Sequence, residues 1–181
     1  MSDIVHKKVA AASRDKHRPD DSRYCSLSYK DQRGLAEQCG VSHKQVQLAA
    51  LQQDIVPEVY ARNQKTLSNE DQIKLLDCSV AIIGLGGLGG SVTEILARIG
   101  IGHVTLVDGD CFDDSNLNRQ LLSSVDVLGK KKAEIAAERV AAVNPAVETR
   151  TLAAYFSDDN AADILSDADI AVDCLDSITS R

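Results

Sequence analysis

The sequence predicts an α/β fold: a Rossmann-like, doubly wound, mostly parallel sheet, preceded by a small helical N-terminal segment. Three observations lead to this prediction. Residues 79–84, SVAIIG, form a continuous apolar and β-branched run, as expected of a strand that is buried on both faces. Further runs of this kind alternate with stretches of helical periodicity, which is the pattern of a parallel sheet with crossover helices. The length of 181 residues suits one such domain with a short extension.

The first part of the chain divides into two segments. Residues 1–24 are polar, charged and aperiodic, so we expect them to be disordered or loosely attached. Residues 25–56 have apolar side chains at helical spacing, with Gly40 placed to end a first helix and Ser42 placed to cap a second. This pattern predicts a helix-turn-helix-like segment, which is either a DNA-reading module or a plain helical hairpin that docks on the main domain.

Pro57 marks the start of the predicted nucleotide-binding domain, residues 57–181. Ser68, with Asp71 three residues on, is placed to cap a helix. From there the pattern predicts strands and helices in alternation. We expect strands over residues 79–84, 103–108, 147–153 and 168–175, helices over 87–99, 130–144 and 158–166, and a polar loop over 109–128.

Composition and charge restrict the class of protein. No apolar run approaches the length of a membrane span, and residues 1–20 lack the apolar core of a secretory signal, so we expect a cytoplasmic protein without a membrane partner. The five cysteines are an odd number without a C-x-x-C pair, which argues against a zinc site or a disulfide framework. Residues 57–181 carry 11 Lys and Arg against 20 Asp and Glu, so this domain is a poor general binder of polyanions. We therefore expect no nucleic-acid partner, and a bound nucleotide needs specific local cations.

A glycine-rich turn joins the first predicted strand of this domain to its helix, with the spacing Gly84-x-Gly86-x-x-Gly89 and with Gly87 inside the turn. Glycines at these places permit a tight turn, let the backbone approach a phosphate and allow close packing of helix on sheet. The N-terminus of the helix offers free N–H groups and a positive dipole end. Asp108 ends the second strand, 19 residues past Gly89, where an acid can bind ribose hydroxyls. The turn admits NAD, FAD or ATP, but no Walker lysine follows it, which excludes a P-loop NTPase. A turn that only packs helix on sheet is the alternative without a ligand.

Cations downstream of the second strand favour ATP over NAD. Backbone amides can hold a pyrophosphate by themselves, whereas a triphosphate needs cations around it. Arg119 lies 11 residues past Asp108 and can fork two phosphate oxygens, and Lys132 lies 13 residues further on. Lys132 stands in the first turn of a predicted helix, where a cation works against the helix dipole, so we expect an anion nearby. A solvated basic helix start is the alternative.

Several motifs, in order and correctly spaced, resemble the ThiF/MoeB/HesA group of bacterial relatives of ubiquitin-activating enzymes. They are GLGGLGG, LVDGD, SNLNRQLL, LGKKKAEIAAERVAAVNP and DCLDS, and the resemblance covers about residues 58–181. It implies an adenylyltransferase that uses ATP and Mg²⁺ to activate the C-terminal glycine of a small ubiquitin-like sulfur-carrier protein of the ThiS/MoaD type. It also implies a homodimer. The chain stops at Arg181, before the further strands of this group, so we expect a truncated chain.

The resemblance also implies roles for individual residues. The glycines of the turn cradle the nucleotide, and the aspartate that ends the second strand takes the ribose. Asn116 and Arg119 line the phosphate path, and Lys132 matches the lysine of the group. Asp176 matches an aspartate that holds magnesium, and Arg62 matches an arginine that reaches into the active site of the neighbouring subunit. The expected catalytic residues are thus Arg119, Lys132, Arg62 and Asp176.

Each of these assignments has a plainer alternative. Asp176 can cap a following helix, Arg62 can be a surface arginine, and Asn116 can cap a short helix or hold a turn. The group usually has Asn after the magnesium-binding aspartate, where this chain has Ser177. Two other functions also stay open: an NAD-dependent oxidoreductase, and a nucleotide-sensing regulator whose helical segment reads DNA.

Overall fold

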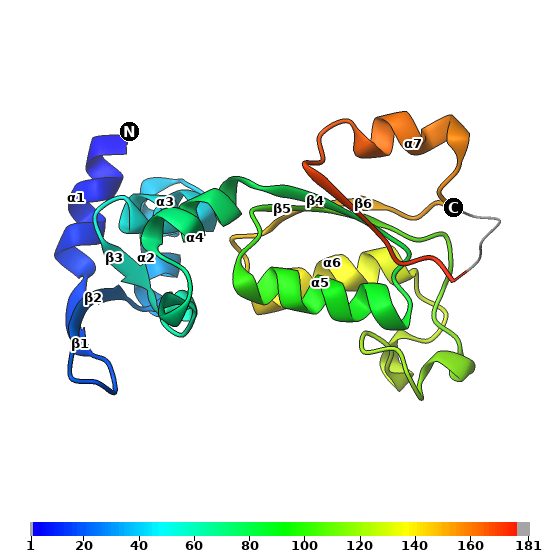
Figure 1. Ribbon diagram of the computed structural model, residues 1–181, viewed down its shortest axis with the longest axis horizontal. Coiled ribbons are helices and arrows are strands. Elements are labelled where there is room, and N and C mark those ends of the chain that lie inside the picture. Colours follow the sequence, from blue (N-terminus) through cyan, green and yellow to red (C-terminus); the bar gives the residue numbers. More distant parts are fainter. Residues whose placement is uncertain (1, 177–181) are drawn as a thin grey trace. The chain divides into compact units, whose positions relative to one another are not determined.

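A computed structural model describes residues 2–176 (Figure 1). The chain divides into two compact units, Met1–Leu76 and Asp77–Arg181. The sequence pattern predicts this boundary at Pro57, nearer the N-terminus. The segment after Pro57 belongs to the first unit because Tyr60 is fully buried there and donates its hydroxyl to Gln47 at 2.9 Å.

The first unit combines a small sheet with helices. Its elements are α1 (Ser2–Ala12), β1 (Arg14–His17), β2 (Arg23–Leu27), α2 (Tyr29–Cys39), α3 (His43–Leu51), β3 (Ile55–Pro57) and α4 (Asn69–Asp77), with 3₁₀ turns at Glu58–Tyr60 and Asn63–Lys65. In the sheet, β2 pairs with β1 antiparallel and with β3 parallel. The predicted helix pair is confirmed: Gly40 ends α2 with a left-handed φ of 64°, and Ser42 caps α3 in a capping box with Gln45. Ser68 likewise exchanges hydrogen bonds with Asp71 at the start of α4.

The predicted disorder of residues 1–24 is wrong, because α1 packs into the core of the first unit. Val5 and Val9, four residues apart on one face of α1, are 5% and 0% exposed. They belong to a hydrophobic cluster that also contains Leu27, Leu35 and Val46. Two valines among charged neighbours make too sparse a pattern to indicate a helix, and the hairpin of β1 and β2 depends on backbone pairing that leaves no apolar signature.

A buried chain of amides runs through the same unit. Gln32 donates to the carbonyl of Leu27 at 3.0 Å, and its own amide oxygen accepts from Gln47 at 3.1 Å. Gln47 in turn accepts from the hydroxyl of Tyr60. Because buried amides cost free energy unless they are paired, this chain fixes how α2, α3 and the segment after β3 fit together.

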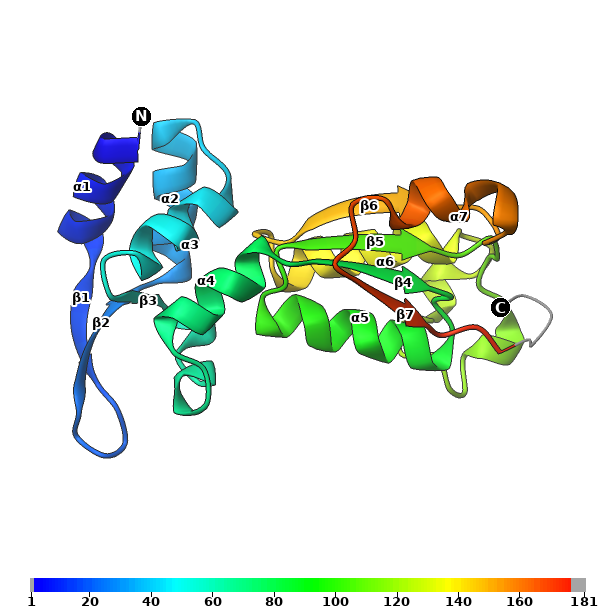
Figure 2. The same ribbon diagram turned by 45° about the horizontal axis from the view of Figure 1, so that its top comes forward.

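The second unit is a parallel sheet with helices on both faces. Its elements are β4 (Ser79–Ile83), α5 (Gly87–Ile99), β5 (His103–Val107), α6 (Lys132–Val143), β6 (Glu148–Leu152), α7 (Asp158–Leu165) and β7 (Ile170–Asp173). The strand order is β6-β5-β4-β7, and each neighbouring pair is parallel. Figures 1 and 2 show α5 and α6 on one face of the sheet and α7 on the other. This is the arrangement of a Rossmann-like half, so the predicted fold class is confirmed.

The centre of the second unit lies in β4 and β5, whose residues are buried after the first position of each strand. Glu94 of α5 is 9% exposed and accepts hydrogen bonds from Arg139 of α6 at 2.8 Å and from Arg98 at 2.6 Å. It therefore ties α5 to α6. No helix within residues 2–176 is long and apolar enough to cross a membrane.

Candidate nucleotide site

A cavity of about 400 Å³ opens beyond the carboxyl ends of the strands of the second unit. Its lining comes from the glycine turn, from the segments after β5, β6 and β7, and from the start of α6. The predicted site residues that line it are Gly84, Gly86, Gly87, Asp108, Arg119, Lys132 and Asp176. They are far apart in the sequence and meet because parallel strands end at the same edge of a sheet, where ligands of such folds bind.

The glycine turn requires glycine at two positions for different reasons. Gly84 has a φ of 90°, and a Cβ there would lie 2.9 Å from the carbonyl oxygen of Cys174, on the neighbouring chain segment after β7. Gly89 lies in the first turns of α5, and a Cβ there would lie 1.8 Å from the carbonyl oxygen of Gly84. Gly89 therefore does not line the cavity but lets α5 start directly against the end of β4. The early N–H groups of α5, which have no acceptor within the helix, are the groups that can face a phosphate.

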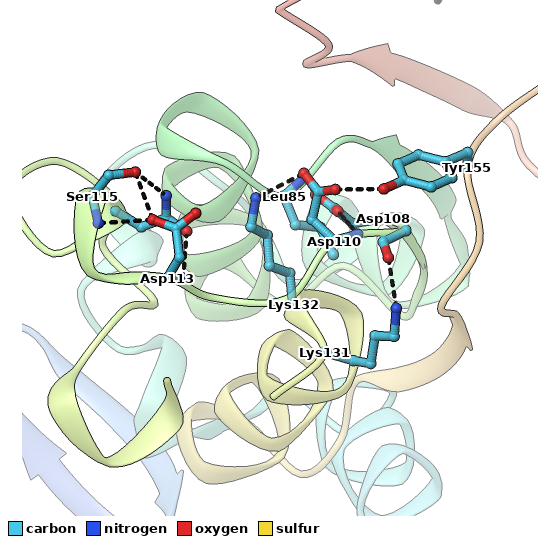
Figure 3. Close-up of polar contacts among 10 residues, drawn as sticks. Leu85, Asp108, Asp110, Asp113, Ser115, Lys131, Lys132 and Tyr155 are labelled. Atoms are coloured by element: carbon cyan, nitrogen blue, oxygen red, sulfur yellow. Dashed lines mark hydrogen bonds and ion pairs between the residues drawn. The ribbon is translucent and has the colours of Figure 1, made fainter. Parts of the chain in front are cut away.

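Asp108 holds the turn in place. One oxygen of its carboxylate accepts from the backbone N–H of Leu85 at 2.7 Å, and the other accepts from the N–H of Asp110 at 2.8 Å (Figure 3). The carboxylate thus joins the end of β5 to the turn after β4. Each oxygen keeps a further lone pair for a ligand hydroxyl, so the predicted ribose contact is chemically possible while Asp108 performs this structural role.

Asp110 is a second carboxylate in the cavity, which the sequence reasoning missed. It lies between Lys132, whose Nζ is 3.2 Å from Oδ2, and Tyr155, whose hydroxyl donates to Oδ1 at 2.7 Å (Figure 3). The hydrogen bond from Tyr155 and, after it, the contact with Lys132 lower the pKa of Asp110 against the opposing effect of burial. The D-x-D spacing at the end of β5 was the signal for it, because a second acid directly after a strand end also reaches the ligand edge.

Lys132 is 6% exposed and is the first residue of α6. The anion expected beside it is present in the form of Asp110. Lys132 is therefore a buried lysine that lines the cavity and pairs with a carboxylate, and not a solvated lysine. Its contact with a phosphate stays a prediction. Lys131, its neighbour, donates instead to the carbonyl of Gly109 at 2.7 Å.

Backbone hydrogen bonds pair the two ends of the loop between β5 and α6. The N–H of Phe112 donates to Lys130 at 2.9 Å, and the N–H of Gly129 donates back to Phe112 at 2.8 Å. Cys111 and Lys131 form an antiparallel bridge just outside this pair. This pairing fixes the base of the loop, from which the residues at its far end extend toward the cavity.

Three residues at the far end of the loop differ in what they do. Arg119 is exposed and lines the cavity. Asn116 does not line it: its Oδ1 accepts from the N–H of Asp113 at 3.2 Å, and its carbonyl accepts from the backbone of Arg119 and Gln120. Asn116 thus holds the turn, which is the plainer of its two alternatives, and its contact with phosphate stays a prediction. Gln120, which the sequence reasoning missed, lines the cavity at 8% exposure, and its buried Oε1 has no hydrogen-bond partner within residues 2–176.

Asp176 lines the cavity from the segment that follows β7 and is exposed to solvent. Cys174 lies beside the turn, and its N–H continues the sheet by donating to Ile83 at 2.8 Å. Burial raises the pKa of its thiol, as expected of a half-buried structural cysteine.

The ThiF family matches residues 60–181. The chain belongs to the ThiF family. The adenylyltransferase and sulfurtransferase UBA4 of Scheffersomyces stipitis is 34% identical over 181 residues, which are 99% of this chain and 35% of that protein. The molybdopterin-synthase adenylyltransferase of Salmonella typhimurium is 37% identical over 112 residues, 62% of this chain and 45% of that protein. The solved structure of the Escherichia coli tRNA N6-threonylcarbamoyladenosine dehydratase in complex with ATP has a TM-score of 0.65 and 30% identity, covering 67% of this chain and 50% of that one. The chain thus spans less than half the length of the curated relatives.

The ThiF-family resemblance also assigned roles to Asp176 and Arg62. Mg²⁺ is usually bound by one or two carboxylates together with phosphates and water, and Asp176 supplies one exposed carboxylate to the cavity, so the residues present fit that ion. No cluster of three or more metal-ligating side chains occurs within residues 2–176. Arg62 belongs to the first unit, where it lines a separate cavity with Lys16 and Glu58. Its action on a neighbouring subunit stays a prediction, and Ser177 lies outside the described residues.

Proposed function

We propose that the chain binds ATP in the cavity of the second unit and uses it to adenylate a carboxylate. The observation that carries this proposal is that Lys132 and Arg119 converge on the same cavity as the glycine turn. Two cations beside a backbone phosphate cradle suit a triphosphate, whose charge exceeds that of a dinucleotide's pyrophosphate. The names of the relatives, which include adenylyltransferases, support the same reaction.

The reaction requires alignment and charge neutralisation more than a side-chain nucleophile. A carboxylate oxygen of the acceptor attacks the α-phosphorus, the bond from that phosphorus to the bridging oxygen breaks, and pyrophosphate leaves with the electron pair. Lys132 and Arg119 stabilise the charge that develops on the leaving group, and the N-terminus of α5 orients the phosphates. The Oε1 of Gln120, which has no hydrogen-bond partner within residues 2–176, is placed to accept from a ribose hydroxyl. A Mg²⁺ ion held by Asp176 and the phosphates would add further neutralisation of charge.

We also propose that the acceptor is the C-terminal glycine of a small ubiquitin-like sulfur-carrier protein and that the enzyme is a homodimer in which Arg62 reaches the partner's phosphates. The carrier is favoured because relatives named for sulfur transfer and for molybdopterin synthesis are 34% and 37% identical to this chain over 99% and 62% of its length. A relative named for a modified tRNA nucleoside offers a different acceptor with the same activation chemistry. The NAD-dependent oxidoreductase is the weaker candidate, since a dinucleotide does not require the buried lysine.

Exchange of labelled pyrophosphate into ATP tests the activity. We expect exchange that depends on a ubiquitin-like carrier ending in Gly-Gly and that disappears when these two residues are deleted from the carrier. Exchange with tRNA fragments bearing threonylcarbamoyladenosine, and none with carriers, would replace the carrier by the nucleoside acceptor. Fluorescence titration with NADH completes the comparison: tight binding of NADH without binding of ATP would overturn the proposal.

A further inference from the structure

Tyr155 lies on the segment that follows β6 and forms one wall of the nucleotide cavity. Its side chain is 71% exposed, although it is large and partly apolar. The ring lies flat enough against the backbone of Gly109 that a Cβ on this glycine would be 2.8 Å from three ring carbons. The backbone carbonyl of Tyr155 accepts from the side chain of Asn160 at 2.8 Å, which ties the segment to the start of α7. An exposed ring is thus fixed at its backbone and at its hydroxyl, which donates to Asp110.

The strand order places Tyr155 at one end of the site. Along the carboxyl edge of the sheet, the glycine turn follows β4, Asp108 and Asp110 follow β5, and Tyr155 follows β6. Because β5 lies between β4 and β6, these three features come in a row. A nucleotide with its phosphates on the turn and its ribose at the acids therefore directs its base toward β6.

We propose that Tyr155 forms the base end of this site: its ring stacks on the purine of the nucleotide, and its hydroxyl holds Asp110 in place for the ribose. This inference rests on the proposed binding of ATP and adds the side chain that recognises the nucleoside. An aromatic face that is open to solvent can stack on a base without displacing core residues, and such stacking is a strong and general means of holding bases. Gly109 permits the arrangement because any side chain there would push the ring away from the edge.

The charges around the ring agree with this role. The neighbouring carboxylate of Asp110 raises the pKa of the Tyr155 hydroxyl, so the hydroxyl stays a donor at neutral pH. The same hydrogen bond lowers the pKa of Asp110, so that carboxylate stays an acceptor for ribose hydroxyls. Both groups therefore have the protonation state that the proposed contacts need.

Calorimetric binding of ATP and of inorganic tripolyphosphate, which lacks base and ribose, separates the two ends of the site. Tyr155→Ala is expected to weaken ATP about tenfold, because base stacking is lost. Tyr155→Phe keeps the ring and is expected to weaken ATP by about two- to fourfold, through loss of the hydroxyl. Tripolyphosphate should bind both variants as it binds the unaltered protein. Tyr29→Ala is the matched control, since Tyr29 is also exposed, at 47%, but stacks on His43 in the first unit.

Two results would overturn the inference. Unchanged ATP affinity in Tyr155→Ala would show that the ring contacts no base, and an equal loss for tripolyphosphate would show a general disturbance of the cavity. Failure of the proposed function gives a different pattern, because the unaltered protein would then bind neither ATP nor tripolyphosphate. Unaltered circular dichroism of each variant confirms that the affinities refer to folded protein.

Discussion

Glu94 joins the helix that begins at the glycine turn to the helix that begins at Lys132, so its removal tests how the site is held together. Its side chain is 11% exposed, and it accepts hydrogen bonds from Arg139 at 2.8 Å and from Arg98 at 2.6 Å. Hydrogen bonds to charged groups contribute about 1.5–3 kcal/mol each when buried. Both arginines are about half exposed, at 45% and 60%, and water replaces part of what they lose. We expect Glu94→Gln to destabilise the second unit by about 2 kcal/mol at neutral pH.

The effect should depend on pH with a definite sign. The hydrogen bond from Arg139 is the largest influence on the pKa of Glu94 and lowers it from the usual 4.5, against the effect of burial. A carboxyl with a lower pKa in the folded state stabilises the protein above the pKa of the unfolded chain, and this stabilisation is lost as the pH falls through the folded pKa. The difference between wild type and Glu94→Gln should therefore be fully present at pH 7 and shrink in acid below about pH 4.

Native-state hydrogen exchange of the amides of β4 and β5 measures this difference within the second unit, and exchange of the amides of α2 and α3 measures the effect of the control within the first. Glu37→Gln is the matched control: Glu37 pairs with Arg33 one helical turn away at 3.0 Å, but its side chain is 66% exposed. Exposed pairs of this kind contribute about 0.3–0.5 kcal/mol, so the control should change stability little. The reasoning is refuted if Glu94→Gln loses no more stability than Glu37→Gln, or if its loss is the same at pH 7 and in acid.

Three further predictions concern other parts of the molecule. Gly89→Ala should destabilise the second unit by more than about 3 kcal/mol, because the added Cβ clashes with the backbone of Gly84. Gly34→Ala is the matched change in the interior of α2, where a Cβ meets no atom within 4 Å, and should stabilise the first unit by about 0.5–1 kcal/mol. Unfolding temperatures of both variants equal to that of the unaltered protein would contradict both predictions. Lys132→Met should weaken ATP at least about tenfold in calorimetry, with little change for Lys130→Met, since a charged hydrogen bond to phosphate is lost; similar losses in both variants would argue for non-specific attraction. Gln47→Leu should destabilise the first unit by about 2–3 kcal/mol in urea unfolding, because it interrupts the buried amide chain, and a smaller loss than 0.5 kcal/mol would show that the chain relaxes around the gap.

The strands β4 and β5 could be predicted from the sequence because buried strands leave continuous apolar runs, and the helices of the second unit because their apolar residues have regular spacing. The glycine turn and the helix caps at Gly40, Ser42 and Ser68 could also be predicted, since each depends on a local backbone conformation or hydrogen bond that few residue types can provide. Arg119, Lys132 and Asp176 were assigned to the site through their motifs, and the cavity brings them together.

What could not be predicted depends on contacts between distant segments. The packing of α1 rests on Val5 and Val9, whose partners come from other elements of the first unit. Asp110 and Tyr155 are separated by 45 positions, so nothing local signals their hydrogen bond. The free amide oxygen of Gln120 becomes visible once the surrounding atoms are placed, because a buried polar atom without a partner has no signature in a sequence.

The backbone pairing at the base of the loop after β5 has a consequence for the free energy of nucleotide binding. Its closure costs entropy when the chain folds, before a nucleotide arrives, and binding does not have to repeat this ordering step. Less of the interaction free energy between the cavity and a nucleotide is then lost to ordering of the loop. Substitutions at the tip of the loop can accordingly change the side chains that line the cavity while the paired base of the loop stays the same.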